Sequence, residues 1–133
     1  MRRAMVVSPS WADFYRETHI PSGVRVGTVV HLSGHTGETA DGVFPFEPES
    51  QIRQTFHNIA ETLAEAGADW SNVVEMTSYH VGLQNQAAPL LMIAAEFLED
   101  PYPAWTAVGV TELFLSDALV EISCVAVLRP EVE

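Results

Sequence analysis

The stretch PESQIRQTFHNIAETLAEAG, residues 48–67, carries the clearest structural signal in the chain. Its apolar side chains recur mostly three or four positions apart, which places them along one side of a helix with 3.6 residues per turn. Glu49 and Ser50 suit the start of such a helix, and Gly67 suits its C-terminal cap. We therefore predict an amphipathic helix over residues 48–67 whose inward side chains are Ile52, Phe56, Ile59, Ala60 and Leu63.

A second helix is predicted from about residue 85 to residue 99, where apolar residues again follow helical spacing. Pro89 lies near its first turn, where proline is tolerated, and Asp100-Pro101 ends the helix. The side chains expected to face the core are Ala87, Leu90, Leu91, Ala94, Phe97 and Leu98.

Five segments rich in β-branched residues are typical of strands: 24–26, 28–33, 73–81, 106–111 and 119–128. The first two flank Gly27 and form a candidate hairpin. The order β-β-α-β-α-β-β predicts an α+β domain in which one sheet carries both helices on one face.

The last strand has two different faces. Side chains from Val120 to Leu128 at even positions are apolar or small, so this face is expected to pack on the helices. The other face includes Glu121 and Ser123 among apolar residues, which suggests that another subunit covers it. Cys124 falls on the apolar face, which favours a buried, inert thiol over a nucleophile.

Length and composition indicate a single domain over residues 1–133. The chain has 133 residues, of which 47% are hydrophobic, enough for a sizeable core. No apolar run approaches the roughly 18 residues of a membrane span, so no membrane partner is expected. The single cysteine, Cys124, has no intrachain disulfide partner, which favours a cytoplasmic location.

The charge balance argues against nucleic acid and anionic membranes as partners. Six arginines, no lysine and eighteen carboxylates give a net charge of −12. Binding a phosphate backbone needs several aligned cations, but no arginine lies between Arg53 and Arg129. We therefore expect no nucleic-acid partner.

The histidines do not form a metal motif. His31 and His35 would be ~13 Å apart along one strand, too far to share a metal ion. His57 is expected to face solvent on the first helix, and His80 has no recognisable partner. With no glycine-rich phosphate loop either, the sequence predicts no metal and no cofactor.

Five short motifs, in order and suitably spaced, resemble the RidA/YjgF family over roughly residues 24–128. They are VRVG leading to LSG at 24–34, IRQT with NI at 52–59, LAEAGA at 63–68, PA-x-T at 103–106 and VEI at 120–122. The resemblance implies a chorismate-mutase-like fold with one mixed sheet. It also implies a homotrimer with ligand pockets between subunits, and hydrolysis of reactive enamines and imines.

The chain departs from the family pattern around the pocket. Trp105 stands in place of the arginine that holds the substrate carboxylate, and Ser123 in place of the second glutamate of VEIE, whereas Glu121 is retained. Ser33-Gly34-His35 replaces the family's SGQ, and the tyrosine before the first strand aligns with Ile20.

The change at Trp105 bears directly on the substrate. An indole has one donor and no charge, and losing an oriented charge-assisted partner typically costs ~2–5 kcal/mol when the other charge is desolvated. We therefore expect a less acidic, more apolar or aromatic substrate. Trp105 is either a wall of the pocket or an aromatic anchor at a subunit interface, and Arg16 or Arg25 is a possible replacement cation.

The resulting hypothesis is a divergent RidA-like enzyme that hydrolyses an imine, enamine or related C–N bond of a small molecule. The alternative is a non-catalytic ligand-binding or regulatory trimer. Glu121 either orients water or pairs with a neighbouring subunit, and His35 acts in proton transfer or is structural. The candidate catalytic residues are Glu121, Ser123 and His35, and the candidate substrate-binding residues are Trp105, Thr106, Ser33, Gly34 and Ile20.

Overall fold

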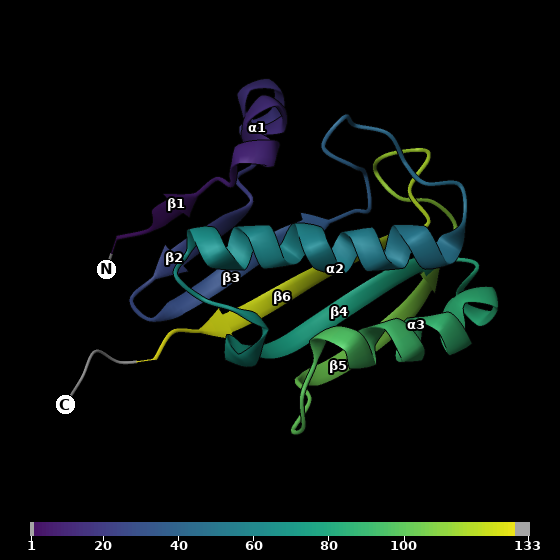
Figure 1. Cartoon of the computed structure of the whole chain (residues 1–133). Coiled ribbons are helices and arrows are strands. Elements are labelled where there is room, and N and C mark those ends of the chain that lie inside the picture. The colour runs from purple at the N-terminus through teal and green to yellow at the C-terminus, as the bar shows by residue number, and fades with distance from the viewer. Residues whose placement is uncertain (1, 130–133) are drawn as a thin grey trace.

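A computed structural model describes residues 2–129, in which six strands form one sheet (Figure 1). The strands are β1 (Ala4–Val6), β2 (Gly23–Val26), β3 (Val29–His35), β4 (Val73–Val81), β5 (Ala104–Val110) and β6 (Val120–Val127). The helices are η1 (Pro9–Trp11), α1 (Ala12–Thr18), α2 (Pro48–Glu65), η2 (Trp70–Asn72) and α3 (Leu83–Phe97). The sheet order is β1-β2-β3-β6-β4-β5, with β4 and β5 parallel and the other neighbours antiparallel.

The predicted α+β arrangement is confirmed. The order β-β-α-β-α-β-β appears from β2 to β6, and α2 and α3 lie on the same face of the mixed sheet (Figure 1). The sequence did not reveal β1 or α1. A three-residue strand is too short to display alternation, and a seven-residue helix shows fewer than two turns of periodicity.

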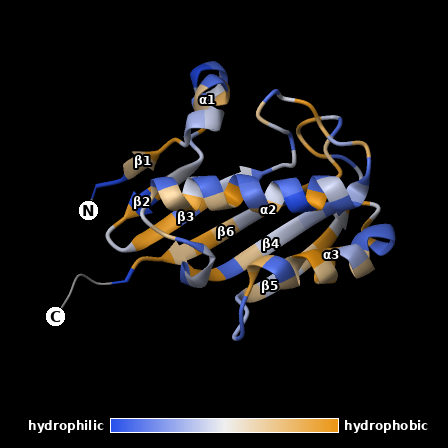
Figure 2. Cartoon of the chain, viewed as in Figure 1, coloured by the Kyte–Doolittle hydropathy of each residue, from blue (hydrophilic) through white to orange (hydrophobic). Residues whose placement is uncertain are grey.

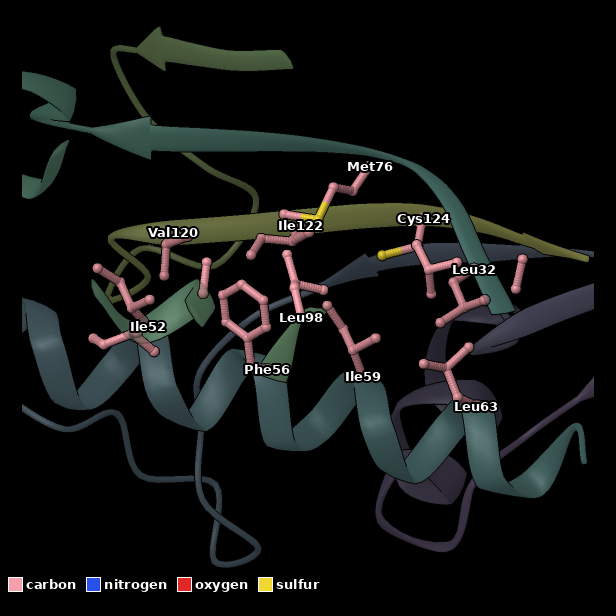
Figure 3. Close-up of a cluster of buried hydrophobic side chains, with 14 of the residues drawn as sticks. Leu32, Ile52, Phe56, Ile59, Leu63, Met76, Leu98, Val120, Ile122 and Cys124 are labelled. Carbon is pink, nitrogen blue, oxygen red and sulfur yellow. The ribbon is translucent and has the colours of Figure 1, made fainter. Parts of the chain in front are cut away.

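Helix α2 forms the centre of the core, as its periodicity predicted. Ile52, Phe56, Ile59 and Leu63 are fully buried against the sheet, and Figure 3 shows them facing side chains of β6, β4 and β3. Gly67 follows the helix with φ of 80°, so the C-terminal cap uses the left-handed conformation that glycine adopts without strain.

The buried side of helix α3 differs in part from the predicted one. Leu90 and Ala94 are buried as expected, but Leu91 is 62% exposed and Ile93 is buried in its place. Successive helix positions differ by about 100°, so residues 86, 90, 93 and 94 share the face toward the sheet while 91 points away.

Strand β6 shows the predicted two faces. Ile122, Cys124 and Ala126 are buried under the helices, whereas Glu121 and Ser123 are half-buried on the opposite face. Burial raises the pKa of the Cys124 thiol to about 12, so the thiol stays protonated and inert, as expected.

Strand β3 contains an irregularity that determines which side of the sheet His35 faces. Leu32 pairs with Cys124 and His35 pairs with Ile122, and the register shifts between the two pairs. The extra residue reverses the alternation, as in a β-bulge. His35 therefore points to the helix side, where it is 1% exposed, whereas regular alternation along the strand would place it on the same face as Ser33.

Helix α2 is amphipathic, whereas α3 is apolar on more than one side. Figure 2 shows hydrophilic and hydrophobic residues alternating around α2, which has its apolar side on the sheet. On α3, Leu91 and Met92 are apolar side chains left exposed. Within residues 2–129, no helix has both the length and the apolar character needed to cross a membrane.

Candidate functional site

A cavity of about 490 Å³ lies between α1, α2, the end of β3 and two long loops, 36–47 and 111–119. In Figure 1, α1 and these loops project on the same side of α2. The volume falls in the range typical of small-molecule sites. Segments distant in the sequence therefore form one concave surface.

One wall of the cavity is apolar and largely aromatic. Trp11 donates from its indole Nε1 to the backbone oxygen of Ile20 at 2.8 Å, and its ring meets Phe14 edge-on at 5.3 Å between centroids. Phe14 in turn meets Phe114 edge-on at 6.5 Å. Such edge-to-face contacts favour defined ring orientations, so α1 and the 111–119 loop share one aromatic surface. Leu115 completes this wall.

The carboxylate of Glu121 enters the cavity from β6 and lies over Gly34. A Cβ atom at position 34 would overlap Oε2 of Glu121, so glycine leaves room for the carboxylate. Burial, with a smaller effect of the nearby Glu38 carboxylate, raises the pKa of Glu121. A carboxyl group with a raised pKa is suited to donate a proton in one step and accept one in the next.

Two further carboxylates line the cavity, and each accepts a hydrogen bond from a neutral hydroxyl. Thr36 Oγ1 donates to the Glu38 carboxylate at 2.8 Å, and Ser10 Oγ donates to Glu61. Asn58 Nδ2 donates to the backbone oxygens of Thr36 (2.8 Å) and Glu38 (2.9 Å), which ties the 36–47 loop to α2. The position of Glu38 is thus set by a side chain of α2.

His35 borders the cavity but is held within the protein. Its Nδ1 lies 2.7 Å from the backbone oxygen of Ser33, which only accepts, so Nδ1 carries the proton and Nε2 accepts from the Thr62 hydroxyl at 2.8 Å. Burial lowers the pKa of His35 to about 4. The imidazole is therefore neutral at pH 7 with both nitrogens engaged. The proton-transfer role expected from an ordinary histidine pKa does not fit this environment.

Five of the eight predicted site residues meet at the cavity: Ile20, Ser33, Gly34, His35 and Glu121. The hydroxyl of Ser33 donates to the backbone oxygen of Pro21 at 2.8 Å, which joins β3 to the segment before β2. Ser33 therefore positions this side of the cavity through backbone contacts.

Trp105 lies outside this cavity, with its side chain against the core. Its indole Nε1 donates to Ser78 Oγ at 2.9 Å, and Ser78 Oγ lies 2.8 Å from Nε2 of the fully buried His80. Nδ1 of His80 donates to Gln86 Oε1 at 2.8 Å. The sequence showed no partner for His80; in the structure its partners are the side chains of Ser78 and Gln86.

Ser123 and Thr106 also lie outside the cavity, on the sheet face opposite the helices. Ser123 pairs with Thr77 of β4, as does Thr106 from β5 on the other side. Ser123 borders a shallow hollow of about 190 Å³ that also includes His31 and Glu75.

Neither of the two arginines considered as a replacement cation lines the cavity. Arg16 pairs with Asp13 on α1, and Arg25 donates to the backbone oxygen of Gly27 at 2.8 Å. Within residues 2–129, no three His, Cys, Asp or Glu side chains group closely enough to hold a metal ion.

The family model described as endoribonuclease L-PSP matches residues 15–128 of this chain. The chain belongs to the RidA/YjgF family. RutC family protein YjgH of Escherichia coli K12 is 33% identical over 114 residues, covering 85% of this chain and 87% of that protein. The solved structure of protein YJGH superposes with a TM-score of 0.88 at 30% identity, covering 98% of this chain and 100% of that one.

Another RidA/YjgF relative is the 2-iminobutanoate/2-iminopropanoate deaminase of Dermatophagoides farinae. It is 33% identical over 112 residues, covering 80% of this chain and 83% of that protein. At this level of identity, two members of one family can have different residues in their pockets.

Sequence reasoning missed much of the cavity lining of this RidA/YjgF chain. Trp11 and Phe14 are spaced three apart, a helical signal that precedes the recognised motifs. Glu38 and Phe114 lie in loops, where no periodicity relates them to α2 or α1. Glu61 lies on the polar side of α2, and polar residues on that side of a helix ordinarily indicate no more than contact with solvent.

Proposed function

We propose that this chain hydrolyses a small imine, or the enamine tautomer of such an imine, and that this substrate carries no carboxylate. The observation that carries the proposal is the half-buried Glu121 carboxylate, set over Gly34 in a cavity with an aromatic wall. The kinship with an imine deaminase supports the reaction class. The absence of arginine from the described lining supports a substrate without an anionic group.

In the proposed reaction Glu121 acts first as acid and then as base. The protonated carboxyl gives its proton to the imine nitrogen, or to the β-carbon of an enamine, which leaves an electrophilic iminium carbon. The carboxylate then takes a proton from water as the water oxygen bonds to that carbon. Proton transfer to nitrogen and cleavage of the C–N bond release ammonia or an amine, with its electron pair, and leave a carbonyl. Water supplies every atom added.

We also propose that the chain assembles as a homotrimer and acts in the cytoplasm. The helices cover one face of the sheet, whereas Ser123 and Thr106 lie on the uncovered face, and Phe114 at the cavity is 78% exposed. A partner subunit on these surfaces would place ligand sites between chains. Mass measurement in solution should give three times the 14.6 kDa of one chain, and a monomer would contradict this assembly. With a net charge of −12, nucleic acid is no part of the proposal.

The test compares two imines made in situ. An amine oxidase acting on 2-phenylethylamine produces an imine without a carboxylate, and an amino acid oxidase acting on phenylalanine produces the corresponding 2-imino acid. Hydrolysis is followed by NMR, as the increase on addition of the protein in the rate at which the imine signal is replaced by that of the aldehyde or 2-keto acid. We expect hydrolysis of the first imine in preference to the second. Saturable binding without any turnover would instead indicate a ligand-binding trimer.

Replacing Gly34 by Ala should remove activity while leaving the fold intact. The new methyl group would displace the Glu121 carboxylate, which is the far end of a flexible side chain, and Gly34 does not have a positive φ. We expect a loss of activity of about a hundredfold, within the range for a displaced acid–base group, with little change in Tm. Full activity in this variant would contradict the role assigned to the carboxylate.

A further inference from the structure

The cavity combines carboxylates with aromatic rings and lacks a compensating permanent cation among the described residues. Glu38, Glu61 and Glu121 all line it, and the two histidines in the lining do not carry the permanent charge of an arginine. His35 uses both ring nitrogens inside the protein, and His57 is exposed on α2.

We propose that the ligand of this cavity is a cation with an aromatic or aliphatic body: an ammonium, which is a protonated amine, or a protonated imine. This inference rests on the proposed function, because it names the substrate class of the same site. It also states what the site rejects, since a carboxylate-bearing compound would meet uncompensated like charges.

The hydrogen bonds of the carboxylates support a cationic ligand. Glu38 and Glu61 accept from the neutral hydroxyls of Thr36 and Ser10, which leave their negative charge in place. The amide of Asn58 is used on two backbone oxygens. The two arginine–carboxylate pairs of the described residues, Arg16–Asp13 and Arg53–Glu96, do not include these carboxylates.

The aromatic wall supports the same ligand class. The indole N–H of Trp11 is already donated to the backbone oxygen of Ile20, so Trp11 offers a ligand apolar and π surface in place of a donor. Phe14 and Phe114 extend this surface. Aromatic faces attract organic cations and also accommodate an apolar body. The net charge of −12 further favours the approach of cations.

Equilibrium binding of three ligands of matched shape tests the proposal: 2-phenylethylamine, 2-phenylethanol and 3-phenylpropanoate. Calorimetry at neutral pH and low salt should give a Kd for the ammonium about tenfold or more below that of the alcohol, as expected for carboxylate and cation–π contacts. The carboxylate should bind more weakly than either. Equal affinity for the ammonium and the alcohol, or tightest binding of the carboxylate, would overturn the proposal.

Two variants of equal charge change locate the effect. Glu38→Gln removes a carboxylate that has no part in the proposed proton transfers, and it should reduce the preference for the ammonium to about threefold or less. Glu65→Gln, at an exposed position near the end of α2, should leave the preference unchanged. An unchanged preference in Glu38→Gln would contradict the site.

The binding experiment separates this inference from the proposed function. A strong preference for the ammonium without hydrolysis of any imine would contradict the proposed reaction and support the proposed ligand class. Efficient hydrolysis of both imines, together with equal affinity for the three ligands, would contradict the proposed ligand class and support hydrolysis of imines as the reaction.

Discussion

Replacing Glu121 by Gln is expected to lower kcat/KM for imine hydrolysis by about 10²- to 10⁴-fold, the range typical of a lost general acid–base group. Gln keeps the size of the side chain but neither releases nor accepts a proton at neutral pH. The affinity for 2-phenylethylamine should fall much less, because Glu38 and Glu61 still line the cavity. Initial rates of carbonyl formation over a range of imine concentrations would measure kcat and KM separately.

Glu65→Gln is the matched control for this prediction, because it makes the same chemical change at an exposed position outside the cavity. Its kcat/KM should equal that of the unmodified chain. If Glu121→Gln retained full kcat while binding weakened, Glu121 would be a binding residue and another group would have to move the proton.

The second large effect concerns stability at acid pH and arises from His35. The pKa of this imidazole is about 4 in the folded chain and 6.5 in an ordinary environment, so the unfolded chain binds the proton more readily. The stability linked to neutral His35 is therefore fully present above pH 6.5 and is lost as the pH falls toward 4. The loss amounts to about 3 kcal/mol, from 1.36 kcal/mol for each pKa unit.

Urea unfolding between pH 7.5 and 4 of the unmodified chain and of His35→Gln would measure this effect. The difference in unfolding free energy between the two proteins should shrink as the pH falls, since Gln does not titrate. A constant difference between His35→Gln and the unmodified chain would show that the pKa of His35 is the same in the folded and unfolded chains, and would contradict the effect assigned to its burial.

Most of the central fold was predictable because its signals are local and repeated. The periodicity of α2 extends over five turns, and the alternation of β6 correctly separated Cys124 from Glu121. Leu91 was placed wrongly because helix 83–97 has apolar residues on more than one side, so hydrophobicity alone did not single out the buried stripe. The N-terminal elements β1 and α1 were too short to leave a pattern.

The candidate site was predictable only where motifs coincided with strand ends. Gly34 and Glu121 come from β3 and β6, which pair directly, so their meeting follows from the sheet. The contribution of Glu38 depends on a loop held by Asn58, and that contact joins positions twenty residues apart without any periodic relation. The inward orientation of Trp105 depends on Ser78 and its buried neighbours, which no local pattern indicates.

The irregularity in β3 makes the number of residues between Leu32 and Thr36 as important as their identity. Gly34 faces the Glu121 carboxylate, whereas its neighbour His35 faces Thr62 on α2, so these two residues face opposite sides of the sheet. Deleting one of the two residues between Leu32 and His35 would restore regular pairing with His35 still on the helix side, and the cavity would lose either Ser33 or Gly34 from its lining. Evolution of this chain toward new substrates is therefore expected to proceed by exchange of side chains in this segment, with its length conserved.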